Sequence, residues 1–146
     1  MLSSFTKTGL VVLLLAAAAA LAGCTTGQEK VAKLTAEAEK GSVEAMVDVA
    51  EMYCSGTTIE QDDQICGMWM KRAAEKGHIR AQYMLGRMYE LGLGMRADPV
   101  HAYKWYSLSG GQGYKMAQSG AKKMMEIMTP QQQAEAEKLV AESSGK

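Results

Sequence analysis

The chain has 146 residues, enough for one domain, and its 16 Lys and Arg balance its 16 Asp and Glu to a formal charge of zero. That balance argues against the basic face that a nucleic-acid-binding domain presents, so no nucleic acid is expected as a partner. Two prolines, one phenylalanine and no long stretch that alternates with a period of two predict an all-α protein.

Residues 1–23 are predicted to be a targeting segment rather than part of the fold. A single cation, Lys7, precedes an apolar run at residues 10–22 that is too short to cross a bilayer and has the length of a signal-peptide core. The run ends in Leu21-Ala22-Gly23-Cys24, which resembles the lipobox of bacterial lipoproteins. The resemblance implies cleavage before Cys24 and lipid on its sulfur and on the new amino terminus. An ordinary secretory signal with a chance cysteine is the alternative.

A lipoprotein of this kind faces the periplasm in the cell envelope, an oxidising compartment where disulfides persist. Thr25, not aspartate, follows the cysteine, which indicates the outer membrane if the host follows the enteric sorting rule. Residues 24–28 are then the lipidated cysteine and a short tether, and residues 29–146 are the folded domain.

An internal repeat organises this domain. Laying residues 41–76 over residues 77–112 gives seven identities, where about two are expected by chance from average composition. They fall at Gly41/Gly77, Ala45/Ala81, Met52/Met88, Tyr53/Tyr89, Gly56/Gly92, Asp62/Asp98 and Trp69/Trp105. Each repeat is predicted to be a helix A, a short turn and an antiparallel helix B.

In chain order, the domain therefore contains a half-repeat at residues 29–40, repeats at 41–76 and 77–112, and a degenerate repeat or cap at 113–146. Glycines at 36-residue spacing, Gly41, Gly77 and Gly113, are expected to end helices in the left-handed conformation.

The turns within the repeats carry matching end signals. Gly56 and Gly92 are expected to end the A helices, and Asp62 and Asp98 to cap the B helices. Pro99 follows Asp98 at the position where a helix tolerates proline.

Two further features are expected toward the C-terminus. Gly110 and Gly111 each cost about 1 kcal/mol in a helix interior, so the B helix of the second repeat is expected to end early. The closing helix is expected to begin with a capping box formed by Thr129 and Gln132, with Pro130 at its first position.

The aligned aromatic and small residues are assigned to packing. Trp69 and Trp105 are expected at the seam between repeats, and Tyr53 and Tyr89 at a core position with their hydroxyls near the surface. Gly86 removes bulk where helix B crosses helix A.

The second repeat reads Ala81-x-x-x-Leu85-Gly86-x-x-Tyr89-x-x-Gly92-x-Gly94-Met95-x-x-Asp98-x-x-x-Ala102-x-x-Trp105. This pattern resembles the Sel-one-like repeat (SLR), a branch of the tetratricopeptide-type α-solenoids. The first repeat matches in part, with Ala50, Thr58 and Cys66 in place of Gly86, Gly94 and Ala102. The resemblance covers about residues 26–143 and implies a short right-handed superhelix of about seven helices.

Cys54 and Cys66 are candidates for a disulfide. Cys54 ends helix A of the first repeat and Cys66 lies one turn into helix B, so an antiparallel hairpin brings them together. Cysteine-rich SLR relatives also bridge their helices, although with a different spacing. A bridge closing this 13-residue loop stabilises by about 3 kcal/mol in the chain-entropy model. Two free thiols are the alternative.

No motif for catalysis or for a cofactor is found. The chain lacks a phosphate loop, Ser-x-x-Lys and Gly-x-Ser-x-Gly, and is expected not to be an enzyme. His78 and His101 have no accompanying ligand cluster, so no metal site is predicted. The 12 methionines are assigned to core packing or an adaptable binding face, with a copper(I) site as the alternative.

The resemblance implies a non-catalytic, lipid-tethered module that presents a groove to another envelope protein or peptide. In such solenoids the A helices line the concave face. The side chains predicted to bind the partner are Asp48, Glu51, Arg80, Tyr83, Met84 and Arg87. Arg80 and Arg87 lie seven residues apart on one helix face, and the hypothesis is that they pair with a partner carboxylate.

Two alternatives from other classes remain. One is an envelope hydrolase acting on cell-wall or β-lactam substrates, as proposed for some cysteine-rich relatives. The other is a thiol-binding or metal-binding envelope protein. The sequence leaves the oligomeric state open.

Overall fold

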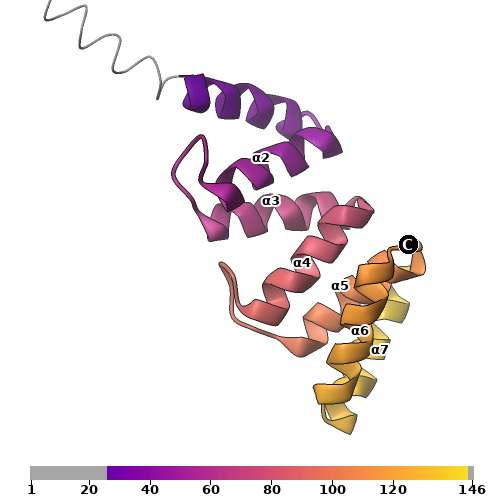
Figure 1. The fold of residues 1–146 in the computed structure, drawn as a ribbon. Coiled ribbons are helices and arrows are strands. Elements are labelled where there is room, and N and C mark those ends of the chain that lie inside the picture. The colour runs from indigo at the N-terminus through magenta and orange to yellow at the C-terminus, as the bar shows by residue number, and fades with distance from the viewer. Residues whose placement is uncertain (1–25, 145–146) are drawn as a thin grey trace, which may run out of the picture.

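The computed structural model describes residues 26–144, and this range contains seven helices and no strand. A first helix at residues 26–39 precedes six that are labelled in Figure 1. These are α2 (Val43–Ser55), α3 (Asp63–Glu75), α4 (Ile79–Leu91), α5 (Pro99–Gly111), α6 (Lys115–Ile127) and α7 (Pro130–Ser144). Successive helices run back and forth and stack into a curved solenoid (Figure 1), which confirms the predicted all-α class.

The first helix already includes residues 26–28, which the sequence analysis assigned to a tether. The expected signal segment at residues 1–23 and the expected lipidation site, Cys24, lie outside the described residues. None of the described helices combines the length and the apolar character that a membrane span requires.

The B helices begin where the repeat pattern predicts. Asp62 Oδ1 accepts hydrogen bonds from the backbone N–H groups of Gln64 and Ile65, both at 2.9 Å. Asp98 Oδ1 does the same for Val100 and His101, at 2.9 and 3.2 Å. These bonds satisfy donors that the first turn of a helix leaves unpaired, which confirms both residues as N-caps.

The glycines end the helices as predicted. Gly56 and Gly92 close the A helices with φ values of 63° and 71°, and each donates its N–H to a methionine carbonyl one turn back. Gly41, Gly77 and Gly113 have φ values of 102°, 87° and 94° between a B helix and the next A helix. A side chain in this backbone region is strained, which explains the 36-residue recurrence of glycine.

The expected early end of α5 is wrong. This helix runs to Gly111 and has 13 residues, as many as α3 in the first repeat. Gly110 is buried, and a Cβ there would lie 3.0 Å from Gln118 Cγ of α6. The Gln118 side-chain amide also donates to the Gly110 carbonyl at 2.9 Å. Close packing against α6 thus offsets the helix cost of the glycine.

The closing helix begins with the predicted capping box. The Gln132 N–H donates to Thr129 Oγ1 at 3.3 Å, and the Thr129 N–H donates to Gln132 Oε1 at 3.0 Å. Its buried Ala136 faces the second of two apolar clusters that make up the core.

The first cluster joins α2, α3 and α4, and Trp105 of α5 reaches into it. Trp69 and Trp105 are both buried there, which confirms their packing role at the seam. Tyr53 and Tyr89 pack against it half-buried. Six methionines are buried in the core: Met46, Met52, Met70, Met88, Met124 and Met128.

Candidate interaction surface

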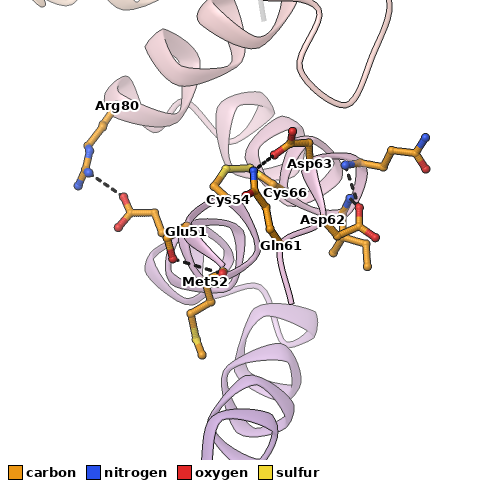
Figure 2. The surroundings of a disulfide bond; sticks show 11 residues. Glu51, Met52, Cys54, Gln61, Asp62, Asp63, Cys66 and Arg80 are labelled. Carbon is orange, nitrogen blue, oxygen red and sulfur yellow. Dashed lines mark hydrogen bonds and ion pairs between the residues drawn. A yellow bond between two sulfur atoms is a disulfide. The ribbon is translucent and has the colours of Figure 1, made fainter. Parts of the chain in front are cut away.

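The disulfide fixes the geometry of the first repeat. Cys54 of α2 and Cys66 of α3 are bonded, with their Cα atoms 5.3 Å apart (Figure 2). Cys66 is fully buried at the position where the second repeat has Ala102. As predicted, the antiparallel hairpin brings the two sulfurs together. Neither cysteine is therefore a free thiol.

An ion pair links the first repeat to the second. Glu51 Oε1 of α2 lies 2.8 Å from an Arg80 guanidinium nitrogen of α4 (Figure 2). The two side chains are 39% and 59% exposed, and exposed ion pairs contribute at most about 1 kcal/mol. The effect of the pair on partner binding is larger than its effect on stability, because Arg80 already has a carboxylate partner within the chain.

An aromatic cluster lies beside this ion pair along α4. The Tyr83 ring centroid is 5.8 Å from that of Tyr106 and 4.9 Å from that of Tyr114. Tyr83 is half-buried and packs against the second core cluster. Met84, the next residue of α4, is half-buried against the first cluster.

Tyr106 is held tightly between two glycines. A Cβ on Gly86 of α4 or on Gly120 of α6 would lie 2.7 Å from an atom of its ring. Real Cβ contacts are longer than this, so both helices approach α5 because these positions lack side chains. This confirms the predicted role of Gly86.

The Tyr106 hydroxyl reaches a charged pair at the surface. It donates to Glu90 Oε2 of α4, and Glu90 Oε1 forms an ion pair with Lys123 of α6. Burial raises the pKa of the Glu90 carboxyl, but the hydrogen bonds from Lys123 and Tyr106 outweigh burial and lower it overall. Burial, followed by the bond to Glu90, raises the pKa of Tyr106. Both groups therefore stay in one protonation state at neutral pH.

A second polar group surrounds the cap of α5. His101 Nδ1 lies 2.8 Å from Asp98 Oδ2, and the His101 ring stacks on Tyr89 with centroids 5.1 Å apart. Burial raises the pKa of Asp98, but its bonds from the backbone and the side chain of His101 lower it overall. The hollow around this group is lined by no serine, threonine or cysteine. Among the residues that line this hollow, the Asp98–His101 pair thus has no serine or threonine hydroxyl and no thiol beside it, and the one hydroxyl there is the phenol of Tyr89.

Comparison with known proteins agrees with the repeat pattern. The Sel1 repeat family matches residues 43–78 and 79–114. A Sel1 repeat protein from Oxalobacter formigenes has a similar structure, with 37% sequence identity and a TM-score of 0.59. That similarity covers 62% of this chain and 68% of the Oxalobacter protein.

The chain belongs to the Sel1 repeat family.

A protective antigen of uropathogenic Escherichia coli strains, described as having an SLR fold, has a TM-score of 0.75 with this Sel1 repeat protein at 28% identity. The match covers 80% of this chain and 25% of the antigen, so the chain spans a quarter of that relative's length. Comparison with curated proteins gave no match. Sel1 repeat proteins typically mediate protein–protein interactions and are typically non-catalytic.

Within the Sel1 repeats, the residues predicted to bind a partner differ in their exposure and in their contacts. Asp48, Arg80 and Arg87 are exposed on α2 and α4. Arg80 also pairs with Glu51, so a partner carboxylate at Arg80 has to share or displace this contact. Tyr83 and Met84 expose only part of their side chains.

The ion pair between Glu90 and Lys123 and the hydrogen bond from Tyr106 to Glu90 were not predicted from the sequence. Lys123 lies 36 residues after Arg87, so both occupy the same position of successive repeats. That spacing was a usable signal. The bond between Glu90 and Tyr106 had no such signal, because only the crossing of α4 and α5 brings these side chains together.

The charges of the A helices change sign along the stack. The charged residues of α2 are all acidic: Glu44, Asp48 and Glu51. In α4 and α6, five cations stand against two carboxylates, namely Arg80, Arg87, Lys115, Lys122 and Lys123 against Glu90 and Glu126. We call these three helices the A-helix surface, with an acidic end at α2 and a basic end at α4 and α6. In the part of the chain that the structure describes, no group of acidic, histidine and cysteine side chains is arranged to hold a metal ion.

Proposed function

We propose that this protein is a lipid-anchored interaction module of the bacterial cell envelope, which binds another envelope protein or peptide along its A-helix surface. The observation that carries the proposal is the change of charge along that surface, from three carboxylates on α2 to an excess of cations on α4 and α6. Such a surface favours a partner segment with its own basic and acidic ends, and it sets the direction in which that segment lies.

The anchor is supported by the sequence Leu21-Ala22-Gly23-Cys24 at the end of an apolar run. Two or more acyl chains hold a protein stably on a membrane, whereas one chain holds it weakly. Under this proposal the protein faces the periplasm, with the outer membrane as the expected location.

The anchor is tested by replacing its cysteine. We expect wild-type protein to partition into the detergent phase and to carry diacylglycerol and amide-linked acyl mass on Cys24. The Cys24→Ser variant should lose both properties. A Cys24→Ser variant that remains in the membrane fraction at the wild-type level would contradict lipid anchoring.

The partner surface is tested by charge reversal. Arg87 is exposed, and no carboxylate of the described residues lies within ion-pair distance of it. We expect Arg87→Glu to reduce co-purification of a partner from detergent-solubilised membranes by about tenfold, or about 1.4 kcal/mol. Lys71→Glu, at an exposed position of α3, is the matched control and should keep wild-type recovery. Equal recovery with both variants would exclude the basic end as the binding region.

A further inference from the structure

The turns between A and B helices lie along one edge of the solenoid, together with the start of the first helix. We call this the turn edge; it comprises residues 26–28, 56–62, 92–98 and 128–129. A Cβ on Gly27 would collide with the Thr58 carbonyl, and a Cβ on Gly94 would collide with the Asp63 carbonyl. Gly27 thus lets the start of the first helix contact the α2–α3 loop, and Gly94 lets the α4–α5 loop contact the start of α3. Figure 1 shows the start of the first helix and the α2–α3 and α4–α5 loops on the same side.

Three large apolar side chains are exposed on or beside this edge. Leu91 ends α4, Leu93 lies in the following loop and Ile127 ends α6, with exposures of 54%, 42% and 63%. Leu91 and Ile127 occupy the same position of successive repeats and line one hollow with Ala97 and Pro99. Single exposed apolar residues are ordinary on protein surfaces, but grouped ones mark contact sites.

The opposite edge provides a comparison. Ile79 and Met116 are also exposed, at 37% and 55%, and they lie in the first turns of α4 and α6. They therefore lie one helix length from Leu91 and Ile127, which is about 20 Å for 13 residues.

The sequence places the lipid anchor next to the turn edge. Only Thr25 separates Cys24 from residue 26, so the chain can span at most about 7 Å between their Cα atoms. Residue 26 begins the described first helix, whose Gly27 contacts the α2–α3 loop. The acyl chains therefore hold this edge, not the opposite one, close to the bilayer.

We propose that the turn edge lies against the lipid surface, with Leu91, Leu93 and Ile127 in contact with the membrane interface. The inference rests on the proposed lipidation of Cys24. The acyl chains supply one attachment and the apolar side chains a second, which together orient the solenoid on its edge. The A-helix surface then stands beside the membrane, with both its acidic and its basic end at a similar height.

Quenching of tryptophan fluorescence by brominated phospholipids tests this orientation. Full-length lipidated protein is reconstituted in phosphatidylcholine vesicles with or without bromine on the acyl chains. Leu93→Trp is compared with Met116→Trp. The fluorescence of the native Trp69 and Trp105 is measured in the wild-type protein and subtracted from that of each variant. We expect at least a twofold loss of the added fluorescence for Leu93→Trp and little loss for Met116→Trp. Ile127→Trp is a second variant at the turn edge and should behave like Leu93→Trp.

Equal quenching at both edges, or no quenching at the turn edge, would overturn the orientation. The absence of quenching would also result if a second copy or a protein covered Leu91 and Ile127, and it contradicts the proposal in that case too. The mass of the Cys24 peptide is measured on the same samples. If Cys24 is lipidated and no quenching occurs, only the proposed orientation is contradicted. If Cys24 is unmodified, both the proposed anchor and the orientation that rests on it are contradicted.

Discussion

At the residue scale, two glycines decide how closely three helices approach. Gly86 and Gly120 contact the two sides of the buried Tyr106 ring, so added side chains there must displace the ring or the helices. Tyr106 in turn places its hydroxyl on Glu90, which pairs with Lys123. One aromatic side chain thus links α4, α5 and α6 through packing and through a charged hydrogen bond.

Gly86→Ala is expected to destabilise the protein by about 1–3 kcal/mol, because the new methyl group overpacks the Tyr106 ring. Gly111→Ala is the matched control, since a Cβ there meets nothing within 4 Å. It should stabilise by about 0.4–1 kcal/mol by restricting the unfolded chain. Urea unfolding followed by circular dichroism measures both changes. Equal effects of the two variants would contradict the packing of Tyr106.

Acid is expected to weaken the fold through Glu90 and Asp98. The net pKa of each carboxyl is lowered in the folded state, despite burial, by the hydrogen bonds described above. A lowered folded pKa contributes stability above the unfolded pKa, and this contribution is lost as the pH falls through the folded value. Stability should therefore be level from pH 7 to about 5 and fall below about pH 4.

The Glu90→Gln variant checks the source of this acid sensitivity. Glutamine cannot lose or gain the proton, so the variant should be less stable than wild type at pH 7 and lose less stability on acidification. Urea unfolding at pH 7, 5 and 3.5 gives the change of stability with pH for the variant and for the wild type. If the variant loses as much stability on acidification as the wild type, the acid sensitivity comes from other carboxyl groups.

At the element scale, helix ends follow from local sequence and helix contacts do not. Asp62, Asp98 and Gly56 act on backbone groups within a few residues, so their roles were predictable without a structure. The length of α5 was not, because Gly110 gains its packing from Gln118 of the next helix. The pairing of Arg80 with Glu51 was not predictable either, because it forms across the junction between repeats.

The disulfide cross-links α2 and α3 in addition to the main chain of residues 56–62, and its removal is expected to cost about 3 kcal/mol. The Cys54→Ala, Cys66→Ala double variant should have the stability of the reduced wild-type protein. Thermal unfolding with and without a phosphine reductant measures this difference. The double variant is its own control, because the reductant should leave its melting temperature unchanged. A wild-type protein insensitive to full reduction would show that helix packing alone holds the hairpin.

At the scale of the whole molecule, the repeat architecture was predictable from the sequence, whereas the distribution of charge over the stacked helices was not. The 36-residue period identified stacked helix pairs, because repeats bury their apolar faces only against neighbours. The change of charge along the A-helix surface emerged only when α2, α4 and α6 were compared as adjacent helices. The identity of the bound partner depends on a second molecule, which this chain's sequence does not encode.

The most direct test of the proposed function is site-specific photocrosslinking in cells that make the lipidated protein. A benzophenone amino acid replaces Asp48, Arg87 or Lys122 on the A-helix surface, and Met68 or Lys71 on α3 as the control, all of which are exposed. We expect the same higher-mass adduct from all three A-helix positions and none from the two α3 positions. Adducts of equal yield from α3, or none from any A-helix position, would contradict partner binding through the A-helix surface.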